Sequence, residues 1–256
     1  MILRIFVLTK KSVIVYAVAV FILLGIFVVG NNFGQAIFTE GAAPDTLPIY
    51  SVETPEKKIA ITFDAAWGNE DTDALLKILG DNNARASIFV VGGWIDRFPD
   101  SVKAFHNAGH EILNHSDTHA HMSNLSEADI ESELGGCEQK ILNTTGVSKK
   151  LFRAPYGEYD DNLIKTAGNE GYKVIQWDVD SLDWKDLTPD EIINRVKAKV
   201  RNGSIILFHN GAENTPAALE KLLPQLAEEG YTFVPVSELI YENNYKINTA
   251  GRQIPN

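Results

Sequence analysis

The chain has 256 residues, of which 45% are hydrophobic and 22% are charged. These values are typical of a globular protein and exclude a disordered tail protein, a collagen-like repeat and a disulfide miniprotein. The formal net charge of −11 argues against a nucleic-acid partner, because neutralising phosphates requires clustered Lys and Arg. The single cysteine, Cys137, excludes an intrachain disulfide, and we expect it to be a small packed residue.

The N-terminal segment differs from the rest of the chain. Residues 12–30 carry no charge and, as a helix, would span roughly 28 Å, enough to cross a bilayer core. Basic residues precede this stretch and favour a cytoplasmic start. We therefore expect residues 1–35 to be a cytoplasmic stub and a single transmembrane helix of the cell membrane, with the domain outside the cytoplasm. The alternative is a cleaved signal peptide and a secreted protein, although signal peptides usually have an apolar region of about 7–15 residues.

Residues 36–56 are predicted to form a linker, since positions 41–55 are rich in Ala, Pro and Thr. Strand and helix patterns then alternate over residues 57–245, and residues 246–256 are expected to be a C-terminal tail. The predicted strands are residues 57–63, 86–91, 110–114, 151–154, 172–177, 204–208 and 231–236. The predicted helices are residues 71–79, 101–108, 161–170, 189–201 and 216–229, with one more starting at Ser126.

This alternation predicts an α/β fold with a parallel sheet, because parallel strands need crossover helices. Either an open doubly wound sheet or a (β/α) barrel fits about seven such units. In both folds the functional groups lie just beyond the carboxyl ends of the strands. The chemically notable residues of this sequence do follow predicted strands: Asp64, His115, Arg153, Asp178, Asp180 and His209. That pattern favours an enzyme.

Two histidines, His115 and His119, have an H-x3-H spacing. On a helix this spacing puts both imidazoles on one face, where they can share a cation. Without further ligands the spacing is equally compatible with two solvated histidines in a polar loop.

Four further residues have chemical roles open to them. Asp64 suits a general base or a helix cap, and Arg153 suits a carboxylate clamp or a packed surface residue. His209 suits a proton donor if an acid such as Asp183 lies near it; otherwise it is a packed residue. Together with His115 and His119, these side chains match the roles that metal-assisted hydrolysis requires.

The same residues resemble five motifs of the polysaccharide deacetylases, carbohydrate esterase family four, which share the NodB-homology domain. The resemblance covers about residues 57–245. In the family's order, the matching stretches are residues 62–68 (TFDAAWG), 115–119 (HSDTH), 153–157 (RAPYG), 180–184 (DSLDW) and 207–209 (LFH). The TFDAAWG variant, the expected membrane anchor and the short domain together resemble the PdaB-like sporulation branch of the family, from spore-forming bacteria.

The resemblance implies a distorted (β/α) barrel and removal of acetate from N-acetyl amino sugars of a cell-wall polysaccharide such as peptidoglycan. It also implies a divalent metal, zinc by preference with cobalt or nickel as alternatives, held by His115 and His119. Asp64 would be the general base paired with Arg153, and His209 would be the acid oriented by Asp183. The Tyr156 backbone N–H would stabilise the oxyanion, while Trp184 and Leu207 would line the sugar and acetate pocket.

One position departs from the family's pattern. The family's third metal ligand is the second Asp of TFDDG, and here that position is Ala65. Three outcomes are open: another carboxylate (Glu70, Asp71 or Asp117) replaces it, the metal binds weakly, or the domain binds glycan without hydrolysing it. The expected function is metal-dependent N-deacetylation, with an inactive glycan-binding domain as the alternative. No feature of the sequence indicates the oligomeric state.

Overall fold

The computed structural model describes residues 47–256. The expected stub and transmembrane helix, residues 1–35, lie outside these residues, as does most of the expected linker. Within residues 47–256, no helix has the length and apolar character needed to cross a bilayer.

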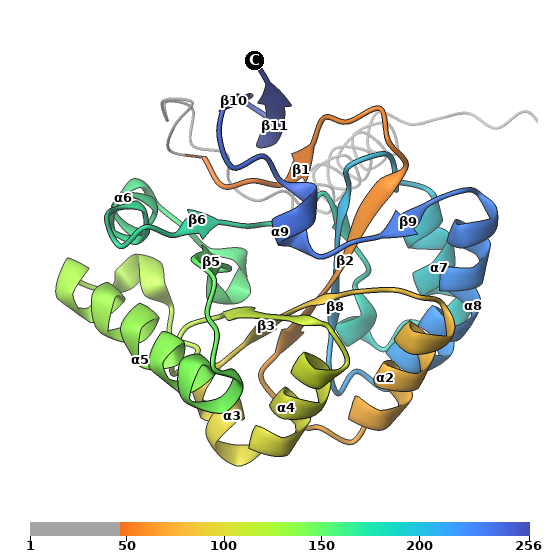
Figure 1. Cartoon of the computed structure of the whole chain (residues 1–256), viewed down its shortest axis with the longest axis horizontal. Helices are drawn as coiled ribbons and strands as arrows, with labels where there is room; N and C mark the ends of the chain where they lie inside the picture. The colour runs from red at the N-terminus through yellow and green to blue at the C-terminus, as the bar shows by residue number, and fades with distance from the viewer. Residues whose placement is uncertain (1–46) are drawn as a thin grey trace, which may run out of the picture. The chain divides into compact units, whose positions relative to one another are not determined.

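Seven parallel strands form one curled sheet (Figure 1), in the order β6-β5-β4-β3-β2-β8-β7. An additional short strand, β9 (Thr232–Phe233), pairs with the beginning of β2. The strands of the path are β2 (Lys58–Ala65), β3 (Ser87–Val90), β4 (Glu111–Asn114), β5 (Leu151–Phe152), β6 (Lys173–Val174), β7 (Val179–Asp180) and β8 (Ile205–His209). This half-barrel agrees with the predicted distorted (β/α) barrel.

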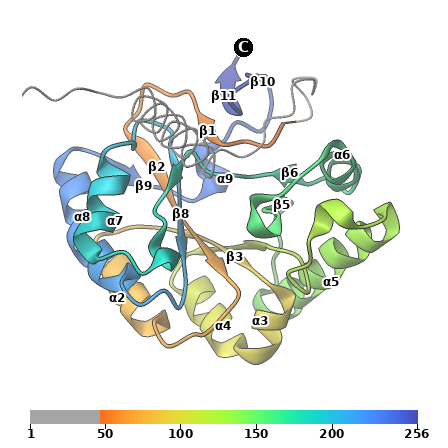
Figure 2. The ribbon, with the colours of Figure 1, turned by 180° about the vertical axis from the view of Figure 1, so that it is seen from behind.

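Helices cover the outer side of the curled sheet, as Figures 1 and 2 show from opposite directions. The longer helices are α2 (Thr72–Asp81), α3 (Gly92–Arg97), α4 (Pro99–Asn107), α5 (Glu127–Thr145), α6 (Asp161–Asn169), α7 (Pro189–Lys197) and α8 (Thr215–Glu228). Shorter helical turns are η2 (Met122–Asn124), η3 (Pro155–Gly157), η4 (Asp183–Lys185) and α9 (Val236–Leu239).

Local sequence signals explain where several helices begin and end. Helix α5 begins where Ser126 accepts a hydrogen bond from the Asp129 N–H, and it ends at Gly146, whose φ of 78° suits the left-handed conformation. Helix α7 begins with a capping box between Thr188 and Glu191, which satisfies two backbone N–H groups at once.

The central strand β2 shows how the core is divided. Ile59, Ile61 and Phe63 pack in the cluster that includes the helices, while Ala60 belongs to a second cluster inside the curl. Because side chains alternate along a strand, Asp64 shares the inner side with Ala60. Near its carboxyl end, β2 therefore directs the Asp64 carboxylate toward the interior of the half-barrel.

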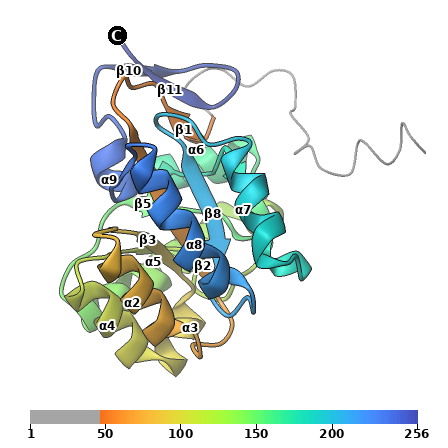
Figure 3. The same ribbon diagram turned by 90° about the vertical axis from the view of Figure 1, so that its right-hand side faces the viewer.

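The two ends of the described chain meet in a small separate sheet, which Figure 3 shows above the barrel. Strand β1 (Ser51–Val52) pairs with β11 (Arg252–Pro255), which pairs with β10 (Tyr245–Ile247). Ser51 also bridges to Ser204, just before β8, so this sheet lies at the amino ends of the barrel strands. Ordered structure thus extends into residues that the sequence suggested were linker and tail.

Some predicted elements differ from the structure. Strand β7 and helix α3 were not predicted, because two residues and six residues are too short for a periodic pattern. The predicted strand at 231–236 is only β9, since α9 begins at Val236.

Candidate active site

A pocket of about 460 Å³ opens at the carboxyl ends of the barrel strands. In the parallel ladder Asp64 of β2 lies directly beside His209 of β8, so the register brings these two side chains to the same pocket. The pocket is lined by Asp64, Ala66, Trp67, His115, His119, Tyr156, Gly157, Trp177, Asp180, Trp184, Leu207 and His209. Sequence-predicted residues from five different strand ends therefore converge here.

Asp64 is held by a buried arginine. Arg153 is fully buried, and its Nη1 donates to Asp64 Oδ1 at 2.7 Å while its Nη2 donates to the Gln176 carbonyl at 3.2 Å. Burial is the largest single influence on Asp64 and would raise its pKa, but the charge and hydrogen bond of Arg153 together with nearby His115 and His209 outweigh burial and hold that pKa below its usual value. Asp64 is therefore an ionised carboxylate that can accept a proton.

His209 is paired with a buried acid. Its Nδ1 lies 2.8 Å from Asp183 Oδ1, and its backbone N–H donates to Asp183 Oδ2 at 2.8 Å. Thr215 also donates to Asp183, at 2.6 Å. Burial lowers the pKa of His209, but the hydrogen bond and charge of Asp183, together with the charges of Asp64 and Asp180, outweigh burial, so the net shift is upward. The protonated imidazole, which is the form that donates a proton, is thereby favoured.

His115 and His119 also lie together, with ring centroids 5.1 Å apart. They do not share a helix face, as the spacing suggested; they lie on a loop in which Ser116 and His119 have positive φ angles of 68° and 63°. Left-handed backbone in non-glycine residues is uncommon and is found at functional sites. Tertiary contacts of the loop, and not helical spacing, bring the two rings together.

Both imidazoles are held neutral. Burial lowers the pKa of His115, and burial together with His115 lowers the pKa of His119 to about 4. The His115 Nδ1 lies 2.8 Å from the Arg153 carbonyl, and donation to that oxygen would leave Nε2 as an acceptor on the side of Asp64, 3.6 Å away. Neutral nitrogens of this kind suit a cation or a hydrogen-bond donor.

The residues present do not complete a catalytic metal site. Catalytic zinc sites have three protein ligands and one open position. Ala65 is fully buried and offers no donor atom. Within residues 47–256, no cluster of three His, Cys, Asp or Glu side chains is arranged to hold a metal ion.

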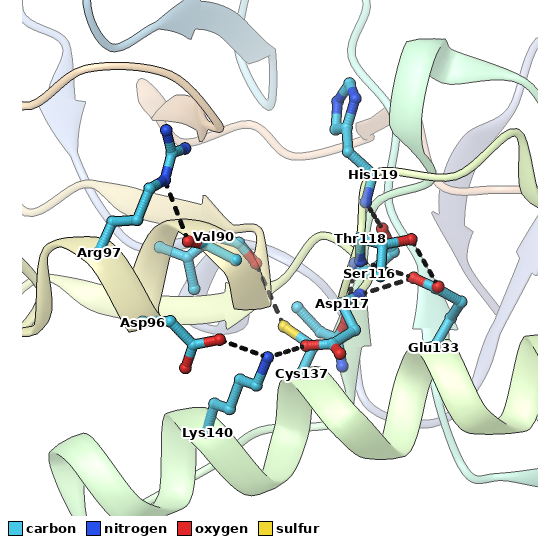
Figure 4. A network of polar contacts seen from close by, with 12 residues as sticks. Val90, Asp96, Arg97, Ser116, Asp117, Thr118, His119, Glu133, Cys137 and Lys140 are labelled. Carbon is cyan, nitrogen blue, oxygen red and sulfur yellow. Dashed lines mark hydrogen bonds and ion pairs between the residues drawn. The ribbon is translucent and has the colours of Figure 1, made fainter.

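The three carboxylates considered as replacement ligands do not line the pocket. Asp117 instead pairs with Lys140 of α5 at 2.7 Å (Figure 4), and Lys140 also binds Asp96. Asp71 accepts a hydrogen bond from the Gly211 N–H at 2.8 Å. The fully buried Ala65 therefore has no carboxylate substitute among Glu70, Asp71 and Asp117.

Helix α5 clamps the histidine loop through a residue that the sequence did not reveal. The Glu133 carboxylate accepts hydrogen bonds from the backbone N–H groups of Asp117 and Thr118, at 2.9 and 2.8 Å, and from the Thr118 hydroxyl at 2.7 Å (Figure 4). Glu133 and Lys140 are seven residues apart on α5, two turns on one face. That spacing was visible in the sequence, but nothing in it indicated the loop as the partner.

The remaining predicted residues occupy different places. Tyr156, Trp184 and Leu207 line the pocket. Asp178 does not: it binds the backbone N–H of Ile205 at 3.0 Å, at the amino end of β8. The sequence placed Asp178 just after a predicted strand, but in the structure Asp178 comes just before β7 and so does not reach the carboxyl-end pocket.

Comparison with known proteins places the chain among relatives of similar sequence. The family model for polysaccharide deacetylase matches residues 51–175. A peptidoglycan-N-acetylglucosamine deacetylase of Bacillus cereus is 37% identical over 197 residues, which cover 75% of this chain and 92% of the relative. An uncharacterized protein, YlxY of Bacillus subtilis, is 32% identical over 207 residues, or 81% of this chain and 64% of YlxY.

Solved structures of similar proteins include a pseudoenzyme. The CE4 family pseudoenzyme BA3943 of Bacillus anthracis has a TM-score of 0.74 and 30% identity, covering 84% of this chain and 74% of that protein. A BA3943 mutant described as having restored enzymatic activity has the same TM-score and 33% identity, covering 78% of this chain and 73% of the mutant. Because sequence, fold and pocket agree, the chain belongs to the polysaccharide deacetylase family, carbohydrate esterase family 4.

Proposed function

We propose that this chain removes the acetyl group from N-acetylated amino sugars of a peptidoglycan-type cell-wall polysaccharide. One observation carries the proposal: a single pocket contains both Asp64, backed by Arg153, and His209, backed by Asp183. A base kept ionised and an acid kept protonated are the two groups that amide hydrolysis needs. Relatives named as peptidoglycan-N-acetylglucosamine deacetylases support the substrate class.

In the proposed reaction, Asp64 takes a proton from a water molecule as that water attacks the acetamide carbonyl carbon. The Tyr156 backbone N–H stabilises the negative oxygen of the tetrahedral intermediate. The C–N bond then breaks, and His209 gives its proton to the departing nitrogen, so that the products are acetate and the free amine. Trp184 and Leu207 flank the sugar and the acetyl group.

We also propose that a divalent cation such as zinc, cobalt or nickel binds only weakly, through His115 and His119. Two neutral imidazoles without a carboxylate form an incomplete site. No step in the reaction above is assigned to the cation.

A second candidate is a glycan-binding domain of the cell envelope that does not turn over its ligand. Ala65, fully buried where the family has a ligand, favours this alternative, as does the similarity to BA3943. It uses the same pocket and the same class of glycan.

The experiment is an acetate-release assay on the full-length chain with peptidoglycan and N-acetylglucosamine oligomers, without metal and with added zinc or cobalt. Deacetylation predicts acetate that is lost in Asp64→Asn while glycan binding remains, because Asn cannot accept the proton. Exposed Asp73→Asn is the matched control and should retain activity. Glycan binding without acetate under every metal condition would support the second candidate instead.

The cellular setting is also a proposal. The uncharged residues 12–30 support a single-pass anchor in the cell membrane with the catalytic domain outside, and the TFDAAWG stretch supports a role in sporulation. Membrane fractionation of cells with protease added outside checks the first point, and spore-cortex glycan composition in a deletion strain checks the second. A chain found only in the medium and shortened at its N-terminus would favour the secreted alternative, because that alternative includes cleavage of a signal peptide.

A further inference from the structure

Half-exposed aromatic rings gather at the mouth of the pocket. Among the large hydrophobic side chains exposed within residues 47–256, Trp67, Tyr156 and Trp184 are 53%, 56% and 52% exposed and all line this pocket. The other two, Leu142 and Val147, lie at the end of α5, away from it. Large aromatic surfaces left open beside a cavity mark a ligand surface, because folding alone gains nothing from their exposure.

The backbone around Trp67 is fixed although its ring is open. The carbonyl of Ala66 accepts a hydrogen bond from Arg97 at 2.8 Å, and the carbonyl of Gly68 accepts one from the fully buried Trp94 at 2.9 Å and another from Asn210. The loop is thus held on both sides of Trp67. A ring presented by a fixed backbone loses little conformational entropy when a ligand stacks on it.

Trp67 stands beside the proposed acid. Its ring centroid lies 5.9 Å from that of His209, with the planes inclined by 33°. A sugar stacked on Trp67 would therefore lie next to the group that protonates the departing nitrogen.

A second aromatic surface lies across the pocket. Tyr156 follows β5, which is separated from β2 by β3 and β4 in the sheet. His121 stacks on the Tyr156 ring with centroids 4.2 Å apart and planes 12° apart, and His121 is bound to Glu158 at 2.8 Å. The pocket is therefore bordered by two aromatic platforms, which follow strands β2 and β5, with two other strands between them in the sheet.

We propose that Trp67 is a specificity-determining residue that stacks the sugar adjoining the one whose N-acetyl group enters the pocket, with Tyr156 supporting the sugar on the other side. The site then takes an internal unit of a chain of at least three sugars in preference to a free monosaccharide. The inference rests on the proposed function only for the ligand class, N-acetylated amino sugars.

The test is calorimetric binding of N-acetylglucosamine and its trimer to the full-length chain and its variants. The full-length chain should bind the trimer at least about 10-fold more tightly than the monosaccharide. Trp67→Ala should weaken trimer binding about 3- to 10-fold, the range expected for one aromatic contact, with little effect on the monosaccharide. Trp67→Phe should retain most of the trimer affinity, and Val147→Ala, an exposed apolar control outside the pocket, should leave it unchanged.

Equal affinity for monosaccharide and trimer would overturn the proposal, as would equal trimer binding by Trp67→Ala and Val147→Ala. A parallel acetate assay separates this result from the proposed function. Length-dependent binding that Trp67→Ala weakens, without acetate release, supports the platform and contradicts deacetylation. Acetate release without length dependence contradicts the platform alone; where acetate is released, Trp67→Ala should raise KM for the trimer more than it lowers kcat.

Discussion

At the scale of single residues, position 65 has the largest consequence for the metal site, because the family has a ligand there and this chain has Ala65. Ala65 is fully buried at the end of β2 and packs in the apolar cluster next to the helices. A carboxylate placed there loses its hydration, a cost that only a charge partner or a cation can offset. Because the family has its third metal ligand at this position, we expect a cation shared with the two neutral imidazoles to be the partner of such a carboxylate.

In metal-free buffer we expect Ala65→Asp to lower the free energy of unfolding by about 2–4 kcal/mol, because it buries an unpaired charge. The melting temperature should fall accordingly. Added zinc should restore the lost stability and raise the melting temperature far more than it does in the parent chain. Thermal unfolding with and without zinc measures both effects. An identical zinc response in the two proteins would show that position 65 does not reach the histidines.

The pairing of His209 with Asp183 predicts a specific pH dependence. Because the folded-state pKa of His209 is raised by Asp183 against the effect of burial, the protonated acid persists to higher pH. Asp183→Asn should move the alkaline limb of the acetate-release profile to lower pH by about one unit or more. Asp178→Asn, which alters a partly buried carboxylate outside the pocket, should leave that limb in place.

The same shift has a consequence for stability. A group whose pKa is raised on folding stabilises the protein below its unfolded pKa, and this contribution is lost as pH rises through the folded value. The parent chain should therefore lose a stabilising contribution from His209 as pH rises above about 6.5. Asp183→Asn should lack this decline. Urea unfolding from pH 5 to 9 measures the free energy of unfolding of both proteins, and an equal pH dependence in the two would contradict the pairing of His209 with Asp183.

At the scale of elements, helix α5 determines the shape of the histidine loop. Glu133 accepts three hydrogen bonds from Asp117 and Thr118, next to two residues in left-handed conformation. Hydrogen bonds to a charged acceptor contribute about 1.5–3 kcal/mol each. The clamp offsets the conformational cost of this backbone.

We expect Glu133→Gln to loosen the loop while the fold remains intact. A neutral amide oxygen accepts more weakly than a carboxylate, so the amides of Asp117 and Thr118 should exchange with solvent at least about 10-fold faster. Hydrogen exchange measured residue by residue is the readout. Glu138→Gln, on the same helix but bound to Lys150, should leave the loop protected, and equal exchange in both variants would contradict the clamp.

At the scale of the whole molecule, the two ends of the described chain stabilise the barrel together. Gln253 of β11 is fully buried; its side chain accepts from the Tyr241 N–H at 2.7 Å and donates to the Tyr241 carbonyl at 2.8 Å. These bonds join the small sheet to the segment that follows α9. The last residues of the chain are thus part of the folded domain.

Gln253→Ala should therefore lower the free energy of unfolding by about 1–3 kcal/mol, because it removes both hydrogen bonds to the Tyr241 backbone and leaves the Tyr241 N–H without its acceptor, while the carbonyl keeps Lys173. Chemical denaturation measures the loss. Gln139→Ala, at an exposed position of α5, is the control and should change stability by less than about 0.5 kcal/mol. A loss no larger than that of the control would mean that the C-terminal strand is peripheral.

The sequence by itself determined the strand–helix alternation and the parallel sheet, and it placed several polar residues at the strand ends that border the pocket; the distorted barrel was implied by the family resemblance. The sequence could do so because buried parallel strands are apolar runs and because their carboxyl ends meet at one edge of a sheet. Asp64, Arg153 and His209 were identifiable in this way, whereas Asp183 was suggested only as an acid partner for His209 and by the family resemblance. The absence of a ligand at position 65 was also visible before any coordinates.

Only the tertiary structure decided how those residues act on one another. Asp178 also seemed to follow a strand, yet its contacts lie at the far end of β8, because β7 is too short to leave a pattern. The sequence left Asp117 open as a metal ligand, but in the structure its carboxylate pairs with Lys140 of α5. The Glu133 clamp and the fixed loop of Trp67 likewise depend on partners distant in sequence. Local periodicity records which face of an element is buried, but not which distant side chain it meets, and in this protein those distant partners shape the site.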